Sequence, residues 1–316
     1  MGEARRNPAL EGPAMIPHTQ YTQPEIDHPY RVTRPVSREE ARRYCARLAH
    51  THYENFLVAG LFCPKPLRQH FYNIYAYCRI SDDLGDEIGD PRKSLMLLDW
   101  WEAELDAMYR GQPQHPVFVA LSETVEQFHI PPDPFRNLLR AFRQDQVQSR
   151  YATYADLLAY CVYSANPVGH LVLYLCGYDD AGMRALADKT CTALQLANFW
   201  QDVSRDLDKN RIYIPQEDLQ RFGVTEAQLV ARRFSPEYAR LIRFEVERTY
   251  PLFEAGKSLG ALVDRRVRLD IEMFTQGGLE VLRRIEQQGY DTLTRRPAIP
   301  KSRQMVLLLR RLLQIG

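Results

Sequence analysis

Two groups of polar residues stand out because their spacing matches one turn of a helix. Asp82 and Asp86 are four residues apart, and Asn198, Asp202 and Asp206 repeat at the same interval later in the chain. On an α-helix, side chains four residues apart project from the same face. Like charges in such rows repel each other, so two rows in otherwise apolar segments require a cation between them. The spacing therefore predicts two facing helices that hold metal ions.

The ligand chemistry of these rows indicates the metal and its partner. Carboxylate and amide oxygens without His or Cys are hard ligands, which suit Mg²⁺. Because Mg²⁺ keeps bound waters and favours phosphate oxygens, we expect a phosphorylated substrate. Arg79, just before the first row, and Arg211, just after the second, would help hold the anion. Aromatic and aliphatic residues fill the segments around the rows, which predicts a diphosphate joined to an apolar chain.

Each of these features also has a plainer interpretation. A single pair of Asp residues four apart is usually a solvated helix face, and Tyr75 and Tyr77 alone would be core residues. Arg211 has the alternative role of capping a helix end. Glu126 and His129 have the Glu-x-x-His spacing of di-iron bundles, but such sites need a second copy, which the sequence lacks. The presence of two rows favours the metal–diphosphate interpretation.

The elements that must position these residues are helices almost throughout. Ser37 and Glu40 have the spacing of a capping box, which opens the first helix. Alternation typical of strands is nearly absent. Periodicity and Pro or Gly interruptions predict further helices at about 65–84 and 92–110, one ending near 129, one from 134 to about 148, and others near 153–176, 180–208, 235–258, 260–288 and 302–314. We expect a Pro-rich extended arm (1–36) followed by one all-α domain (37–316).

Composition and charge narrow the class of protein. The 316 residues are 45% hydrophobic and 26% charged, which is typical of a globular chain. The formal net charge of +1 argues against nucleic-acid binding through a basic face. No Cys-x-x-Cys pair, signal peptide or membrane-spanning stretch is evident, so we expect a cytoplasmic protein. The apolar and basic segment 305–315 is compatible with peripheral contact at the inner face of a membrane.

The chain resembles the squalene/phytoene synthase family over about residues 38–300. Two motifs carry this resemblance: 75–86, which contains the first acidic row, and 195–215, which contains the second. The phrases at 52–56, 67–70 and 160–169, and the stretch 198–202, resemble the hydroxysqualene synthase branch of hopanoid-type squalene biosynthesis. The resemblance implies a single-domain isoprenoid-synthase helical bundle around a central cavity. It also implies about three Mg²⁺ ions bound together with the diphosphate.

The resemblance assigns roles to residues within the acidic rows and outside them. The implied metal ligands are Asp82, Asp86, Asn198, Asp202 and Asp206. The implied catalytic residues are Tyr75, Arg79, Tyr160 and Tyr163. The implied substrate-binding residues are His52, Asn55, Phe56, Asn166, Gln195, Gln201 and Arg211. Ring faces of Phe56, Tyr160 and Tyr163 would stabilise a carbocation, and Asn166, Tyr163 and Gln201 are alternatives for orienting a water molecule.

Three departures from the family pattern bear on the substrate. Condensing relatives usually have Arg immediately before the first Asp of the second motif, where this chain has Gln201. Relatives often place a Tyr in the penultimate helix, where this chain has Gly277 and Gly278, and commonly show Ala-Gly where it has Asn166 and Pro167. Together these departures favour an enzyme that handles one preformed C30 diphosphate over one that binds two separate prenyl diphosphates.

The expected activity is the conversion of presqualene diphosphate and water to hydroxysqualene with loss of diphosphate. A nicotinamide is not expected, because no Gly-x-Gly-x-x-Gly sequence follows a strand. One alternative is a head-to-head condensing synthase that makes squalene or phytoene from farnesyl or geranylgeranyl diphosphate. A second is a non-catalytic assembly protein, which would be expected to lose Asp from the motifs. The expected partners are a prenyl diphosphate and other enzymes of the pathway.

Overall fold

The computed structural model describes residues 28–32, 34–51 and 65–298. Three residues implied in substrate binding lie outside this part of the chain: His52, Asn55 and Phe56. The helix expected at 302–314 also lies outside it. Within the described residues every regular secondary-structure element is a helix, apart from an isolated β-bridge between Arg150 and Ile212. The expected all-α fold class is therefore confirmed.

The described residues form a series of α-helices and one 3₁₀ helix. Their order and bounds are α1 (Arg38–Thr51), α3 (Lys65–Asp86), α4 (Pro91–Tyr109), α5 (Pro116–Phe128), α6 (Asp133–Asp145), α7 (Tyr154–Ser164), α8 (Asn166–Leu175), α9 (Ala181–Asp208), α10 (Gln216–Phe222), α11 (Glu226–Val230), α12 (Pro236–Gly256), the 3₁₀ helix η2 (Lys257–Ala261) and α13 (Arg265–Gln287). None of them, over the described ranges, is both long enough and apolar enough to cross a bilayer.

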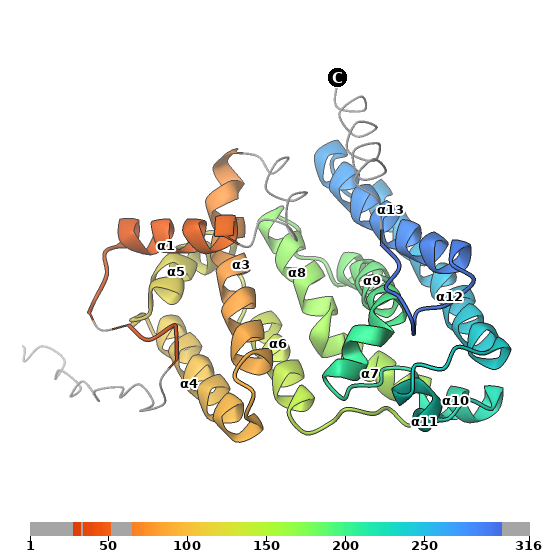
Figure 1. The fold of residues 1–316 in the computed structure, drawn as a ribbon. Helices are drawn as coiled ribbons and strands as arrows, with labels where there is room; N and C mark the ends of the chain where they lie inside the picture. The colour runs from red at the N-terminus through yellow and green to blue at the C-terminus, as the bar shows by residue number, and fades with distance from the viewer. Residues whose placement is uncertain (1–27, 33, 52–64, 299–316) are drawn as a thin grey trace, which may run out of the picture.

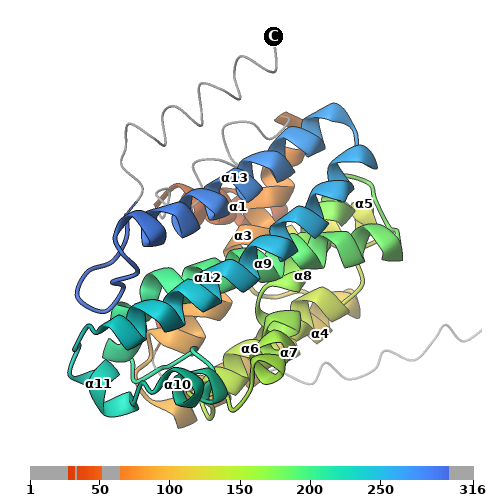
Figure 2. The same cartoon turned by 90° about the vertical axis from the view of Figure 1, so that its right-hand side faces the viewer.

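Helices α3, α8 and α9 lie in the middle of the molecule (Figure 1). Helices α1, α4 and α5 pack on α3, whereas α12 and α13 pack along α9. Figure 2 shows α12 and α13 running beside each other on that side of the molecule. Because α8 contacts both α3 and α9, it links the two helices that carry the acidic rows.

Two separate hydrophobic clusters hold the two halves of this arrangement together. One packs α3 against α4 and α5 around the buried rings of Tyr77, Trp101 and Phe118. The other packs α9 against α12 and α13 around Trp200 and Phe253. Each motif helix therefore buries its apolar face in its own cluster, which leaves its polar face outside that cluster.

The structure divides one expected helix and adds two short ones. The segment expected as a helix over 153–176 is broken at Ala165 into α7 and α8. Pro167 explains the break, because a proline inside a helix has no N–H to donate and its ring clashes with the preceding turn. Between 216 and 230 the chain forms α10 and α11, which were not expected, and Thr225 starts α11 with a capping box.

Candidate active site

The C-terminal ends of α3 and α9 meet at an ionic contact between the two motifs. The carboxylate of Asp86, the last residue of α3, accepts hydrogen bonds from two nitrogens of Arg211 at 2.8 and 3.2 Å. Lys209 Nζ lies 3.0 Å from the same carboxylate. Both cations follow directly after α9, so the structure brings the end of the first row beside the end of the second.

The acidic residues of the two rows lie close enough together to change one another's pKa. Burial and the charge of Asp86 raise the pKa of Asp82 to about 6. Burial and the charge of Asp202 raise the pKa of Asp206 to about 7. Burial is the largest single influence on Asp86 and raises its pKa, but the hydrogen bonds and positive charges of Arg211 and Lys209 together outweigh it, so the pKa of that carboxyl is lowered. Positive charge added beside such a cluster favours the ionised form of its carboxylates.

Arg296 supplies positive charge to the second row from a distant part of the chain. Its guanidinium contacts Asp202, with Nη2 at 3.1 Å from Oδ2, and the same nitrogen lies 3.1 Å from Gln201 Oε1. Gln201 is buried and donates its amide to the carbonyl oxygen of Pro297 at 2.7 Å. Sequence reasoning missed Arg296, because the segment after α13 carries no spacing that relates it to the acidic rows.

Asp145 is a second residue that sequence reasoning missed. It ends α6, and its Oδ2 accepts a hydrogen bond of 2.8 Å from the hydroxyl of Tyr160. Its Oδ1 is buried without a hydrogen-bond partner. Burial raises the pKa of Asp145 to about 7; nearby Arg211 lowers it, and the charges of Asp86 and Asp82 raise it further. Asp145 therefore belongs to the same charge cluster as the first row.

Aromatic rings form a wall next to Asp145. Phe199 and Tyr213 stack with ring centroids 3.9 Å apart and planes inclined by 12°. Tyr160 stacks on Tyr213 at 6.0 Å, and Tyr151 stacks on the same ring at 5.8 Å. We call these four residues, Tyr151, Tyr160, Phe199 and Tyr213, the aromatic wall. They join the apolar core to the polar end of α9.

Arg79 connects the first row to a carboxylate that was not among the predicted site residues. Its guanidinium donates to Asp83, and its Nη1 lies 3.6 Å from Asp82 Oδ2. Asp83 is buried. Tyr75, one helical turn before Arg79, is half-buried, and burial raises the pKa of its hydroxyl. These contacts place two of the predicted catalytic residues on the α3 side of the site.

The remaining predicted residues lie in differing surroundings. On α9, Gln195 is half-buried and Asn198 is exposed. Asn166 is buried at the start of α8, and its Oδ1 accepts a hydrogen bond of 3.0 Å from Thr192 of α9. The ring of Tyr163 faces the guanidinium of Arg140 at 4.0 Å, so one face of this ring already contacts a cation.

The donor set of this site fits magnesium. Within the described ranges no three His, Cys, Asp or Glu side chains converge on one point, and Lys209, Arg211 and Arg296 contact the carboxylates there. The ligands offered by the two rows are hard oxygens, and burial together with repulsion from Asp86 raises the pKa of Asp82. A divalent cation beside these carboxylates would relieve that repulsion.

Comparison with known proteins identifies the family to which this chain belongs. The family model described as "Squalene/phytoene synthase" matches residues 49–303. The 15-cis-phytoene synthase of Synechococcus elongatus is 30% identical over 282 residues, which cover 85% of this chain and 90% of that protein. The 15-cis-phytoene synthase of Synechocystis is also 30% identical, over 288 residues that cover 86% of this chain and 85% of that protein.

Solved structures agree with this result. The squalene synthase HpnC from Alicyclobacillus acidocaldarius is 44% identical, with a TM-score of 0.77 over 81% of this chain and 97% of that chain. A dehydrosqualene synthase in complex with ligand is 27% identical, with a TM-score of 0.79 over 88% of this chain and 97% of that one. The expected isoprenoid-synthase helical fold is thereby confirmed. The chain belongs to the squalene/phytoene synthase family of enzymes, whose substrates are prenyl diphosphates.

Proposed function

We propose that this enzyme converts presqualene diphosphate and water to hydroxysqualene and diphosphate, in squalene or hopanoid biosynthesis. Its identity to the squalene synthase HpnC, 44%, exceeds its 30% identity to the phytoene synthase of Synechococcus elongatus. This difference supports a squalene-type product with a C30 skeleton.

The surroundings of Gln201 are the observation that supports presqualene diphosphate as the substrate. Condensing relatives usually have Arg at this place, directly before the first Asp of the second row. Gln201 is neutral, only 5% exposed, and already hydrogen bonded through both ends of its amide to Arg296 and Pro297. A buried neutral amide adds no charge that would attract a phosphate group. Gln201 itself therefore adds no anion-binding charge where condensing relatives usually have one, which suits a single diphosphate.

Three guanidinium groups surround the rows and would bind the diphosphate. Arg79 lies on the α3 side, Arg211 lies between the rows, and Arg296 lies beside the second row. Guanidinium groups match the geometry of phosphate oxygens and keep their charge at any pH of interest. The members of this family typically depend on Mg²⁺, and the residues proposed to hold it are Asp82, Asp86, Asn198, Asp202 and Asp206. Magnesium bound there would neutralise the charge that develops on the leaving diphosphate.

The reaction needs the cleavage of one bond and the addition of one water molecule. The C–O bond of presqualene diphosphate breaks, its electron pair leaves with diphosphate, and the cyclopropylcarbinyl cation rearranges. Water then adds to the cation and releases a proton. The aromatic wall would stabilise the cation through its ring faces and exclude bulk water. The hydroxyl of Tyr160, held by Asp145 at 2.8 Å, is a polar group on that wall from which a water molecule can be positioned.

The test is the identity of the product. The purified protein is incubated with Mg²⁺ and either presqualene, farnesyl or geranylgeranyl diphosphate, and the extracts are analysed by mass spectrometry. We expect a C30 alcohol from presqualene diphosphate alone, with ¹⁸O incorporated when the reaction runs in H₂¹⁸O. Added NADPH should not change that product. A C30 hydrocarbon formed only when NADPH is present would overturn the assignment of water as the nucleophile.

A condensing synthase is the second candidate function. The observation that favours it is the 30% identity to two 15-cis-phytoene synthases over more than four fifths of the chain. A C30 or C40 hydrocarbon formed from farnesyl or geranylgeranyl diphosphate in the same assay would establish it. The non-catalytic alternative would give no product from any of the three substrates.

A further inference from the structure

Residues that precede α1, within 28–32 and 34–36, contact the side of the first motif helix. The ring of His28 is buried against Trp100 of α4, with ring centroids 4.8 Å apart. The carbonyl oxygen of Tyr30 lies 3.1 Å from His115 Nε2. The hydroxyl of Tyr30 donates to Asp83 Oδ2 on α3. We call residues 28–32 and 34–36 the docked arm.

His115 is held in the tautomer that this docking requires. It is buried at the start of α5, where its Nδ1 accepts a hydrogen bond of 3.2 Å from the backbone N–H of Val117. Since Nδ1 is the acceptor, the proton of the neutral ring is on Nε2, which donates to the carbonyl oxygen of Tyr30. Burial keeps the ring neutral by lowering its pKa to about 3. The Tyr30 carbonyl oxygen therefore accepts a hydrogen bond from the Nε2–H group of a neutral His115.

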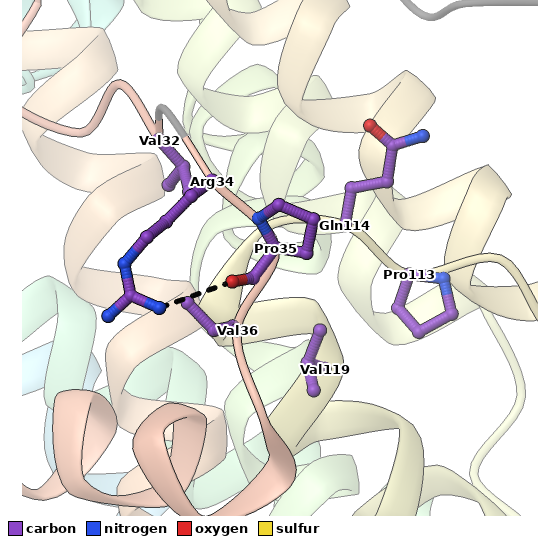
Figure 3. Close-up of a pocket in the computed structure, with 7 residues that line it drawn as sticks. All are labelled: Val32, Arg34, Pro35, Val36, Pro113, Gln114 and Val119. Carbon is purple, nitrogen blue, oxygen red and sulfur yellow. Dashed lines mark hydrogen bonds between the residues drawn. The ribbon is translucent and has the colours of Figure 1, made fainter.

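The docked arm packs less closely further along its length. Val32 and residues 34–36 lie beside α5 and the loop before it, where a pocket of about 270 Å³ remains between Pro35, Pro113 and Val119 (Figure 3). This pocket contains none of the acidic residues. The hydrogen bond from the Tyr30 hydroxyl to Asp83 is the contact of the arm that reaches the polar face of α3.

Asp83 is the link between the docked arm and the predicted site. It is 6% exposed, and it accepts from the Tyr30 hydroxyl on one oxygen and from Arg79 on the other. Arg79 in turn reaches to 3.6 Å from Asp82 Oδ2. A continuous chain of polar contacts thus runs from Tyr30 through Asp83 and Arg79 to Asp82, the first residue of the first acidic row.

We propose that Tyr30 is a positioning residue for the diphosphate site, acting on Arg79 and Asp82 through Asp83. A buried carboxylate that loses one of its two donors is costly, because the orphaned oxygen has no water to replace it. Without the Tyr30 hydroxyl, both terminal nitrogens of Arg79 would turn to Asp83. They would then point away from Asp82 and from the bound diphosphate. This inference rests on the proposed function, since it concerns how the same site binds Mg²⁺ and diphosphate.

The test compares two Tyr→Phe variants in the full-length chain. Tyr30→Phe removes the hydroxyl next to Asp83. Tyr109→Phe is the matched control, because the Tyr109 hydroxyl donates at 3.0 Å to Ile130 O in the same core cluster and has no contact with the acidic rows. Binding of inorganic diphosphate in the presence of MgCl₂ is measured by isothermal titration calorimetry, and thermal unfolding is followed in parallel.

We expect Tyr30→Phe to bind Mg²⁺-diphosphate about tenfold more weakly than the wild type, as for loss of a hydrogen bond to a charged group. Tyr109→Phe should bind as the wild type does. The double variant Tyr30→Phe/Asp83→Asn should bind no more weakly than Asp83→Asn alone, because the link through Asp83 is already broken. If Tyr30→Phe weakened binding only by destabilising the fold, its effect would add to that of Asp83→Asn. The double variant therefore distinguishes a positioning role from a loss of stability.

Equal affinity of wild type, Tyr30→Phe and Tyr109→Phe would overturn the inference and leave the proposed function standing. Additive losses in the double variant would also overturn it. Failure of the wild type to bind Mg²⁺-diphosphate at all would instead contradict the proposed function, and this inference with it.

Discussion

The guanidinium of Arg211 forms a two-point contact with the carboxylate of Asp86, with one nitrogen at 2.8 Å from Oδ1 and the other at 3.2 Å from Oδ2. The two residues are 125 positions apart in the chain. Asp86 ends the first acidic row, and Arg211 follows the helix that carries the second. A two-point contact between a guanidinium and a carboxylate fixes both the relative orientation of the two groups and the distance between them. The contact therefore sets how the ends of α3 and α9 face each other.

The double variant Asp82→Asn/Asp202→Asn removes one carboxylate from each row. We expect turnover to fall by at least about a hundredfold, because metal-assisted charge stabilisation is worth several kcal/mol and each 1.4 kcal/mol is a factor of ten. Far-ultraviolet circular dichroism should not change, since neither side chain belongs to the hydrophobic clusters. Asp99→Asn/Asp208→Asn, which alters two exposed carboxylates, is the control. Retained turnover in the first variant would count against the metal assignment.

Arg296→Gln tests the charge that the segment after α13 brings to the second row. We expect KM for the diphosphate substrate to rise by about tenfold or more, because a charge-assisted contact to an anion is lost. Arg295→Gln is the matched control, since Arg295 is the exposed neighbour of Arg296. Steady-state kinetics of both variants at saturating Mg²⁺ measure the effect. The assignment fails if the two variants have the same KM.

Tyr160→Phe keeps the ring of the aromatic wall and removes only the hydroxyl that Asp145 accepts from. We expect kcat to fall by about tenfold or more while thermal stability changes by only about 1 kcal/mol. Tyr238→Phe gives the comparison, because the Tyr238 hydroxyl is hydrogen bonded to Thr292 at 2.7 Å deep in the same cluster. Its stability should drop similarly with kcat unchanged. Equal kcat values for the two variants would show that the Tyr160 hydroxyl is not used.

The stability of the protein should depend on pH through His115. Burial lowers the pKa of this ring from 6.5 to about 3, so the folded state binds fewer protons than the unfolded state between these values. Its stabilising contribution is therefore complete above pH 6.5 and is lost as the pH falls towards 3.

His115→Asn removes this titration and keeps a residue type that can cap α5. Between pH 7 and pH 5 the wild type should lose about 2 kcal/mol more unfolding free energy than His115→Asn does. Guanidinium denaturation at both pH values measures the difference. Parallel losses in the two proteins would mean that His115 titrates normally in the folded state.

Two adjacent glycines of α13 should respond oppositely to the same substitution. A Cβ on Gly278 would come within 2.4 Å of Phe253 Cζ and 2.8 Å of Leu194, whereas a Cβ on Gly277 would meet nothing within 4 Å. Gly278→Ala should therefore destabilise the protein by about 1–3 kcal/mol through overpacking. Gly277→Ala should leave stability unchanged or raise it by about 0.5–1 kcal/mol, because alanine is the better helix former. Thermal unfolding of both variants tests this, and equal shifts would refute the close packing at Gly278.

These glycines also explain a departure that the sequence showed without a reason. Relatives often have a Tyr at this place in the penultimate helix. The absence of a side chain at Gly278 lets α13 pack directly against α9 and α12. The position is therefore part of how the helix that carries the second acidic row is held.

Local pattern determined much of the fold and the framework of the site. Spacing of four residues placed Asp82 and Asp86 on one helix, and Asn198, Asp202 and Asp206 on another, because one turn of a helix is a local property of consecutive residues. The same periodicity predicted the all-helical class. It did not anticipate the break at Ala165, where Pro167 outweighs an otherwise continuous apolar pattern.

The sequence by itself therefore determined which residues lie on one helix and what chemistry their side chains offer. Only the tertiary structure decided which distant groups join them: Arg296 at Asp202, Asp145 beside the first row, and Tyr30 on Asp83. The residues of these pairs lie in different helices or in segments without periodicity, so no local spacing relates them. Their contacts arise only when the hydrophobic clusters of α3 and α9 bring whole helices together, which depends on packing across the entire chain.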